Sequence, residues 1–445
     1  MTFAIILKGA RSHQRSTTMD YSSKSRQRLC RDISKQGQSV RIAPETIAFT
    51  IVLGVLAALP ALSIDISAPT LVLLPEALHT SLTVAGLTLS LFMAGFALGQ
   101  LGGGRLSDRH GRRPVLLTGL VCYTSAGIAC ALSLSGAELL AFRLVQGIGA
   151  GARSVIAFAM VQDLFKGDQA RSKRSYVTVV FGVVPMFAPA LGAWLAQLAG
   201  WRAVHGVLAL AGALLVFVVW LGVPESKPQA KSKPQATVGG PAAASPSATS
   251  PGRLRDDRQF IGLAAVNALS YGAVFAYIAG SPVVIIEQMG LPSSTYAALF
   301  ACTAAALTAG AWTSGRLSRR GFGASGLLGP SLTIAAGAAL ALVSVSFGAI
   351  ASAGILVPFL LVVLFSRGVT APNLQHLAIE RQPAHAGAAS AAIGVSQLAA
   401  GALTSAAVAV LLPNLGQLAV AAPMAALAAI AAAVWWWTRP LEAAA

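Results

Sequence analysis

Long apolar stretches alternate with short polar or charged connections along most of the chain. Twelve apolar segments of about 20 to 28 residues recur from residue 47 onwards, and each is close to the roughly 20 residues with which a helix crosses a bilayer. The pattern predicts an all-α polytopic membrane protein with twelve transmembrane helices. The predicted segments are 47–74, 82–103, 114–134, 138–161, 176–199, 203–222, 260–286, 295–314, 326–348, 352–378, 387–412 and 416–437.

The polar stretches divide these helices into two groups of six. One internal stretch, rich in Pro, Ala, Ser and Lys, is typical of a flexible linker between two halves. Met19 is a second candidate start besides Met1, and the sequence leaves that choice open. The predicted domains are a disordered basic N-terminal tail (1–45), an N-terminal half (46–222), a linker (223–258), a C-terminal half (259–438) and a short C-terminal tail (439–445).

Composition supports a membrane protein. The chain is 55% hydrophobic and 11% charged, with a mean hydropathy of +0.70, which excludes an ordinary soluble domain. The net charge of +17 would point to nucleic acid in a soluble chain, but here the basic residues are sorted by loop. Of the 32 lysines and arginines, 28 lie in the two tails and the even-to-odd connections. The positive-inside rule therefore predicts cytoplasmic termini, and we expect a bacterial inner (plasma) membrane protein that binds no nucleic acid.

The densest charge lies between the second and third apolar segments. Five charges fall within the ten residues from Gly104 to Arg113, which predicts a tight hairpin at the membrane surface. Gly104 and Gly111 permit a sharp turn and close helix approach there. A weaker copy begins 211 residues later at Gly315 and repeats the first four residues but lacks the acid. A repeat at this spacing indicates two pseudo-symmetric six-helix halves.

The hairpin resembles the signature loop of the major facilitator superfamily, G-x-L-x-D-R-x-G-R-R-x-x-L, which implies that family's fold and a conformational gate. Arg112 is expected to pair with Asp163 at the inner end of the fourth helix. Asp108 is expected to accept hydrogen bonds from the inner end of the eleventh helix, latching the outward-facing state. The gate residues predicted in this way are Gly104, Asp108, Arg109, Gly111, Arg112, Arg113 and Asp163.

Charges inside the apolar segments mark candidate chemistry, because each costs roughly 2.5–3.5 kcal/mol on insertion scales. Asp65 and Arg143 lie at depths that differ by only roughly 6 Å, so an ion pair between them is within reach. The protonation of a carboxylate at that depth depends on its partner, which is the logic of a proton-coupled carrier. The roles of Arg153 and Arg367 stay open, with a structural role favoured.

Two further motifs carry the resemblance. Arg143, Gln146 and Gly147 match the family's helix 4 motif, R-x-x-Q-G-x-G-A, in which the arginine is implicated in proton transfer. The stretch from Gly182 to Gly192 is similar to the antiporter motif of drug exporters, which implies that helix 5 lies at the interface with helix 8; a simple proline kink is the alternative. The residues of that motif are Gly182, Pro185, Pro189 and Gly192.

The resemblance narrows to the bicyclomycin-resistance and chloramphenicol-efflux (Bcr/CflA) drug:proton antiporters. It rests on Leu62-Ser63-Ile64-Asp65, Trp201-Arg202, the stretch from Phe275 to Pro282 and Ala371-Pro372-Asn373. One departure is Gln162-Asp163, where that branch usually has Arg-Asp.

The function expected is proton-coupled efflux of a small drug-like molecule by alternating access, with a proton gradient in place of any cofactor or metal. A metabolite or nutrient carrier is the alternative, and a membrane-embedded enzyme or receptor is disfavoured because no catalytic cluster or soluble domain is evident. We expect a monomer. Asn267, Tyr271 and Tyr277 are the candidate substrate-cavity residues on helix 7.

Overall fold

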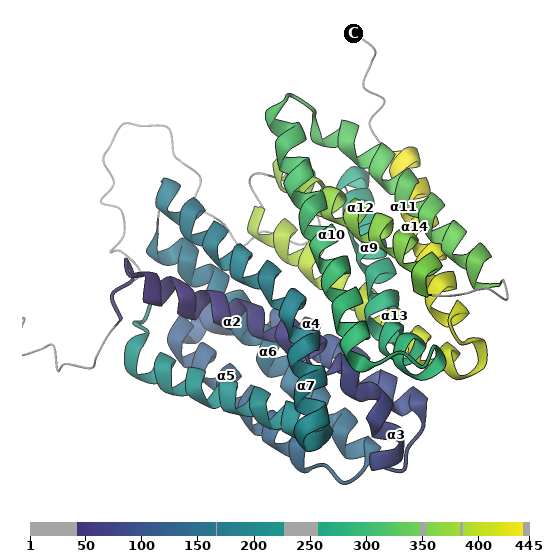
Figure 1. Cartoon of the computed structure of the whole chain (residues 1–445). Helices are drawn as coiled ribbons and strands as arrows, with labels where there is room; N and C mark the ends of the chain where they lie inside the picture. Colours follow the sequence, from purple (N-terminus) through teal and green to yellow (C-terminus); the bar gives the residue numbers. More distant parts are fainter. Residues whose placement is uncertain (1–41, 166, 227–256, 348–352, 383–385, 439–445) are drawn as a thin grey trace, which may run out of the picture.

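A computed structural model describes residues 42–165, 167–226, 257–347, 353–382 and 386–438, which are almost entirely helical. Figure 1 shows two bundles side by side, the N-terminal helices in purple to teal and the C-terminal helices in green to yellow. The predicted C-terminal tail and most of the predicted N-terminal tail and linker lie outside the described residues.

The N-terminal bundle begins with α2, which continues through a short 3₁₀ helix. Its last element, α7, is interrupted at Ala199 and Gly200, where Gly200 has φ 76°. This break falls between the predicted segments 176–199 and 203–222, so α7 unites two of them. The elements are α2 (Ile47–Asp65), η1 (Ala68–Leu73), α3 (Leu74–Ala77), α4 (Leu82–His110), α5 (Arg112–Leu132), α6 (Gly136–Leu164) and α7 (Gly167–Gly222).

The C-terminal bundle repeats this plan, and its first helix passes into a π-helix. Its elements are α9 (Arg258–Pro282), η2 (Val283–Gln288), α10 (Ser293–Arg319), α11 (Ala324–Ser346), α12 (Ala353–Glu380), α13 (Ala386–Leu415) and α14 (Leu418–Thr438). Among the described residues, 11 helices are long and apolar enough to cross a membrane. The predicted number was twelve, and the difference arises because α7 counts once.

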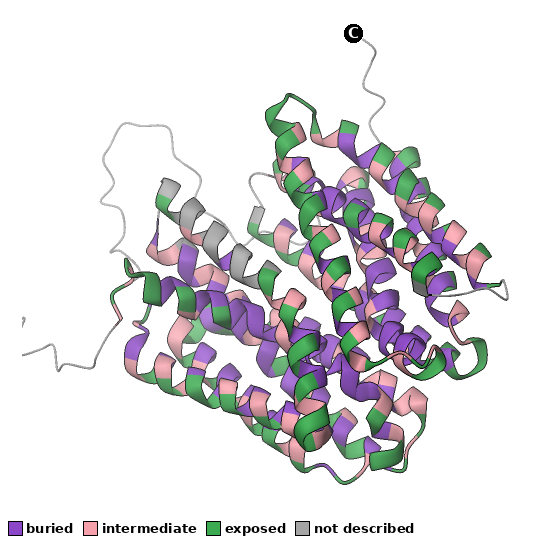
Figure 2. Cartoon of the chain, viewed as in Figure 1, coloured by how far each residue is buried: buried purple, intermediate pink, exposed green. Residues whose placement is uncertain are grey.

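The surface of both bundles is apolar where a soluble protein would be polar. Figure 2 shows exposed residues along the outer faces of the helices. Apolar residues that are at least half exposed include Leu98 and Leu214 in the N-terminal bundle and Ile334 and Leu403 in the C-terminal bundle. Exposed large apolar side chains on so many membrane-length helices mark a surface that contacts lipid. The chain is therefore a multi-pass membrane protein.

The two bundles meet through α4 with α13 and through α7 with α10. Glycine permits the first contact, because a methyl group added at Gly86 would lie 2.7 Å from the Ala409 Cβ. At one end of the molecule η1 also contacts η2, and Ala68 packs in the same apolar cluster as Val283. The bundles are thus closed against each other at the end that holds η1, α3 and η2.

Candidate functional site

One face of α2 is committed to contacts within the N-terminal half. Ser63 Oγ lies 2.6 Å from the Tyr123 hydroxyl, and Arg143 Nη2 donates to Ser67 Oγ at 3.1 Å. Ser67 lies two residues beyond the end of α2, and its hydroxyl donates to the Ser63 carbonyl oxygen at 2.8 Å, so the two serines lie on the same side of the chain. This face binds the polar groups of α5 and α6.

Asp65 lies on the opposite face, since it is two residues from both serines and two residues turn a helix by about 200°. Its side chain is buried, with the residue only 4% exposed. The element that follows Asp65, η1, contacts α9 of the C-terminal half, and the carboxylate lies within electrostatic range of Tyr271 on α9 and Tyr296 on α10. The carboxylate therefore faces the C-terminal half, and no described residue forms a hydrogen bond or ion pair with it.

The ion pair that the sequence allowed between Asp65 and Arg143 is consequently absent. Similar depth in the membrane was not enough, because the two side chains lie on different sides of α2. Arg143 instead donates to Gln146 Oε1 at 3.0 Å, and its guanidinium lies 4.5 Å from the centre of the Phe92 ring. It is a buried cation without a carboxylate partner among the described residues.

Gly147, the third residue of the helix 4 motif, permits close helix packing. An added methyl group there would collide with the carbonyl oxygen of Phe92 on α4. The glycine thus lets α6 approach α4 at backbone distance.

The charged stretch from Gly104 to Arg113 is more helical than the sequence predicted. α4 continues through it to His110, and α5 begins at Arg112. Only Gly111 is outside a helix, with φ 100° and ψ 158°, a conformation that favours glycine. Gly104 is inside α4, so the turn predicted for it was wrong, because Gly111 alone makes the turn.

Arg112 forms the ion pair expected for it. Its Nε donates to Asp163 Oδ2 at 2.9 Å, and both side chains are 15% exposed. Its Nη1 also donates to Asp108 Oδ1 at 2.6 Å, and the Asp108 side chain is 65% exposed. A contact from Asp108 to the start of α13 is not formed by the described residues. Arg109 lies in the last turn of α4, and Arg113 Nη2 donates to the carbonyl of Trp220 on α7.

Glu225 lies beside Arg112 and Arg113, and it was not among the residues predicted from the sequence. Its carboxylate accepts from the backbone N–H groups of Arg112 at 2.8 Å and Arg113 at 3.2 Å. These are the first N–H groups of α5, which lack partners inside the helix and attract an anion. The available signal was an acid just after the apolar segment 203–222, which ends at the same surface as the hairpin.

The helix 5 motif packs against the end of α2. Pro185 and Pro189 lie inside α7, and a methyl group added at Gly192 would collide with the carbonyl oxygen of Ile66. The helix therefore approaches the residue that follows Asp65. α7, which contains the fifth and sixth predicted segments, contacts α10, the eighth; the contact expected for the fifth segment itself stays a prediction. Gly182 lies in the same helix, in a part where side chains are not described.

On α9, two of the three predicted cavity residues join one network. Asn267 Nδ2 donates to Gln397 Oε1 at 3.1 Å, and Asn267 Oδ1 accepts from Arg367 Nη2 at 3.0 Å. The Arg367 guanidinium lies 5.7 Å from the centre of the Tyr271 ring. The network joins α9, α12 and α13, and Arg367 and Gln397 were not predicted to be part of it.

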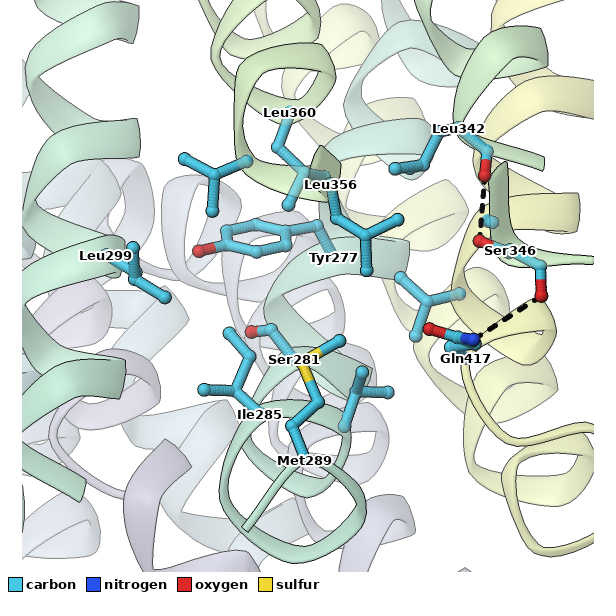
Figure 3. A pocket seen from close by; sticks show the side chains of 14 residues that line it. Tyr277, Ser281, Ile285, Met289, Leu299, Leu342, Ser346, Leu356, Leu360 and Gln417 are labelled. Atoms are coloured by element: carbon cyan, nitrogen blue, oxygen red, sulfur yellow. Dashed lines mark hydrogen bonds between the residues drawn. The ribbon is translucent and has the colours of Figure 1, made fainter. Parts of the chain in front are cut away.

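Tyr277 lies elsewhere, in a pocket within the C-terminal half (Figure 3). The pocket is mainly apolar, with side chains such as Ile285, Met289 and Leu356 pointing into it. Its volume of about 50 Å³ is far below the roughly 300–1,000 Å³ of pockets for drug-sized ligands. The three predicted cavity residues therefore do not share one site.

Comparison with known proteins gives a matching family profile and several similar bacterial proteins. The profile of the Major Facilitator Superfamily matches residues 53–405. An uncharacterized MFS-type transporter of Bacillus subtilis, YdgK, is 31% identical over 364 residues, which are 81% of this chain and 88% of that protein. A bicyclomycin resistance protein homolog of Haemophilus influenzae is 27% identical over 361 residues, 80% of this chain and 88% of that protein. The multidrug resistance protein MdtL of Escherichia coli is 28% identical over 215 residues, 48% of this chain and 52% of that protein.

Solved structures share the fold at low sequence identity. The xylose transporter XylE of Escherichia coli, in a partially occluded inward open conformation, matches with a TM-score of 0.69 at 15% identity, over 88% of this chain and 97% of that one. A bacterial homolog of the human lysosomal transporter Spinster, in an inward-facing and occupied conformation, matches with a TM-score of 0.68 at 16% identity, over 89% and 97% of the two chains. With its two helical bundles, its motif residues and its matched profile, the chain belongs to the major facilitator superfamily.

Proposed function

We propose that this protein is a proton-coupled efflux transporter of small drug-like molecules, of the Bcr/CflA type, in a bacterial inner membrane. The observation that carries the proposal is the placement of Asp65, a buried acid at the end of α2 on the side away from the Ser63 and Ser67 contacts and next to η1, which meets the opposite half. A buried carboxylate without a partner is stable only when it is neutral. A proton or a substrate group is therefore needed to compensate its charge.

The mechanism proposed is alternating access between the two halves. The closed end formed by η1, α3 and η2 corresponds to the outer side if the termini are cytoplasmic, so the structure would be inward-facing. The relatives of known structure in inward-facing conformations support this assignment. In this state Asp108 is bound to Arg112, and its contact with the start of α13 would form when the inner side closes.

Proton coupling would follow from a change in the surroundings of Asp65. When the halves separate at the outer end, Asp65 leaves Tyr271 and Tyr296 and meets water, where the carboxylate ionises or exchanges its proton. When they close again, the carboxylate must be protonated to be buried. In the inward-facing state, substrate binding would exchange against this proton, which leaves to the cytoplasmic side. A cycle that carries protons inward would thus drive substrate outward.

The substrate class follows from charge. In the membrane interior Asp65 is accompanied by three buried arginines, Arg143, Arg153 and Arg367, so a neutral or zwitterionic molecule fits better than a dication. The relatives named for bicyclomycin resistance and multidrug resistance support a drug-like compound. Asn267 and Tyr271 are proposed as one wall of the substrate cavity.

The decisive experiment is transport by Asp65→Asn protein in proteoliposomes with an imposed proton gradient. The amide keeps the size and hydrogen bonding of the carboxylate but cannot titrate. We expect uphill export to be abolished, Asp65→Glu to retain part of it, and the control Glu76→Gln, at an exposed acid of α3, to behave as wild type.

Growth of cells on a panel of toxic compounds decides between drug export and metabolite transport. Exporter-deficient cells that express the protein should gain resistance to several unrelated compounds, and a protonophore should remove it. Wild-type proton exchange in Asp65→Asn would place coupling elsewhere, and growth on a nutrient without any resistance would favour the metabolite carrier.

A further inference from the structure

Pro60 leaves one backbone carbonyl of α2 without its helical partner. The residue lies inside α2, five positions before Asp65. Proline has no backbone N–H, so the carbonyl of Leu56, four residues earlier, loses its normal donor. Leu56 is fully buried, and a buried carbonyl that lacks a hydrogen bond is costly. Something other than the helix must supply a donor at this point.

Arg153 on α6 supplies it. Its Nη1 donates to the Leu56 carbonyl oxygen at 2.6 Å, and its guanidinium lies 4.7 Å from the centre of the Tyr123 ring. The residue is fully buried, and no described residue gives it a carboxylate partner. An arginine is a costly group to place in a membrane, so a simple packing role does not explain it.

We propose that Arg153 is a positioning residue for Asp65. It donates a hydrogen bond to the carbonyl that Pro60 frees and so fixes the orientation of the part of α2 before Pro60 relative to the part after it. Above the proline, Tyr123 contacts Ser63 on the same helix face. These contacts attach this face of α2 to its own half and keep Asp65 turned toward the C-terminal half. We call the contact of Arg153 with the Leu56 carbonyl the clamp. The clamp does not depend on the proposed function of Asp65, but its consequence for transport rests on that function.

The C-terminal half contains an equivalent arrangement that supports the assignment. Asn267 lies 211 residues after Leu56, the same interval that separates the two copies of the charged motif. Arg367, in the sequence Arg-Gly-Val-Thr-Ala that parallels Arg-Ser-Val-Ile-Ala at Arg153, donates to Asn267 at 3.0 Å. The position equivalent to Pro60 is Tyr271. Tyr271 has a backbone N–H, so no carbonyl is freed at this position. Arg367 donates to the side-chain amide of Asn267 instead.

This difference makes a matched double-mutant cycle possible. In Pro60→Ala protein the new N–H restores the helical donor of Leu56, so the clamp is no longer needed. We expect Arg153→Met to lower the melting temperature of the purified full-length protein by roughly 2–4 °C. In the Pro60→Ala background the same substitution should lower it much less. Arg367→Met, the control, should have the same effect in both backgrounds.

Transport separates positioning from general stability. In proteoliposomes, Arg153→Met should reduce uphill proton-driven export about tenfold, the scale expected for a lost buried hydrogen bond, while downhill substrate equilibration changes less than twofold. Arg153→Lys, which keeps a charged donor, should recover part of the coupling.

The outcomes distinguish the two proposals. Equal effects of Arg153→Met with and without Pro60, including failure to fold in both backgrounds, would overturn the clamp. A clear Pro60 dependence in stability, together with wild-type coupling in Asp65→Asn, would retain the clamp and refute the coupling role of Asp65. A Pro60-dependent stability effect with unchanged uphill export in Arg153→Met would refute the positioning role.

Discussion

At the scale of single residues, the two acids that bind Arg112 differ in burial. Asp163 is mostly enclosed, with a side chain that is 15% exposed, whereas the Asp108 side chain is 65% exposed. Solvent screens an exposed pair, which contributes about 0–1 kcal/mol, while a partly buried partner contributes more. The same arginine therefore makes one contact that stabilises the fold and one that is weak enough to exchange.

This difference predicts separate phenotypes. Asp163→Asn should lower the free energy of unfolding by roughly 1–3 kcal/mol, because Arg112 loses its enclosed anion. Asp108→Asn should leave the unfolding free energy within about 0.5 kcal/mol of wild type and yet slow transport, if Asp108 latches the closed inner side. Denaturation in detergent and transport in proteoliposomes measure the two effects. Normal transport by the Asp108→Asn variant would refute the gate.

At the scale of elements, glycines decide how closely helices from the two halves approach. Gly86 on α4 faces Ala409 on α13 across the interface, whereas a methyl group added at Gly102 on the same helix would point into open space. The two positions therefore provide a matched pair of sites. Substitutions there test whether transport requires the close contact between α4 and α13.

We expect Gly86→Leu to slow transport about tenfold or more, because overpacking of a tight contact typically costs 1–3 kcal/mol. The larger side chain would disfavour the state in which α4 and α13 meet. Gly102→Leu should transport at the wild-type rate. Both variants should reach the membrane in equal amounts, as measured by immunoblotting, and equal transport by both would show that this contact is not part of the cycle.

At the scale of the whole molecule, the distribution of basic residues predicts the orientation in the membrane. In a background without the four native cysteines, Phe322→Cys should lie on the cytoplasmic side and Ala77→Cys on the outer side; both positions are exposed. An impermeant thiol reagent applied to intact spheroplasts should label only Ala77→Cys. Labelling of Phe322→Cys alone would reverse the orientation and with it the direction of transport.

The linear sequence was sufficient for the membrane class, for the positions of the apolar segments and for the two-half repeat. Crossing a bilayer imposes a length and an apolar composition on each segment, and both are local properties. The pairing of Arg112 with Asp163 was also predictable, because the ends of α5 and α6 lie at the same surface and carry opposite charges. The helical continuation of α4 to His110 was not, since the charged motif gave no sign that Gly111 alone makes the turn.

The facing of buried side chains was decided only by the tertiary structure. Depth along the chain allowed Asp65 to meet Arg143, but Ser63 and Ser67 bind Arg143 and turn Asp65 to the other half. In the same way, the sequence assigned no specific role to Arg153, whose hydrogen bond to the carbonyl freed by Pro60 depends on the packing of α6 against α2. The direction in which each face of a helix points depends on which neighbouring helices bind the polar groups of that helix, and those neighbours are distant in sequence. Segment positions are therefore encoded locally, whereas the partners of Asp65, Arg143 and Arg153 are set by packing.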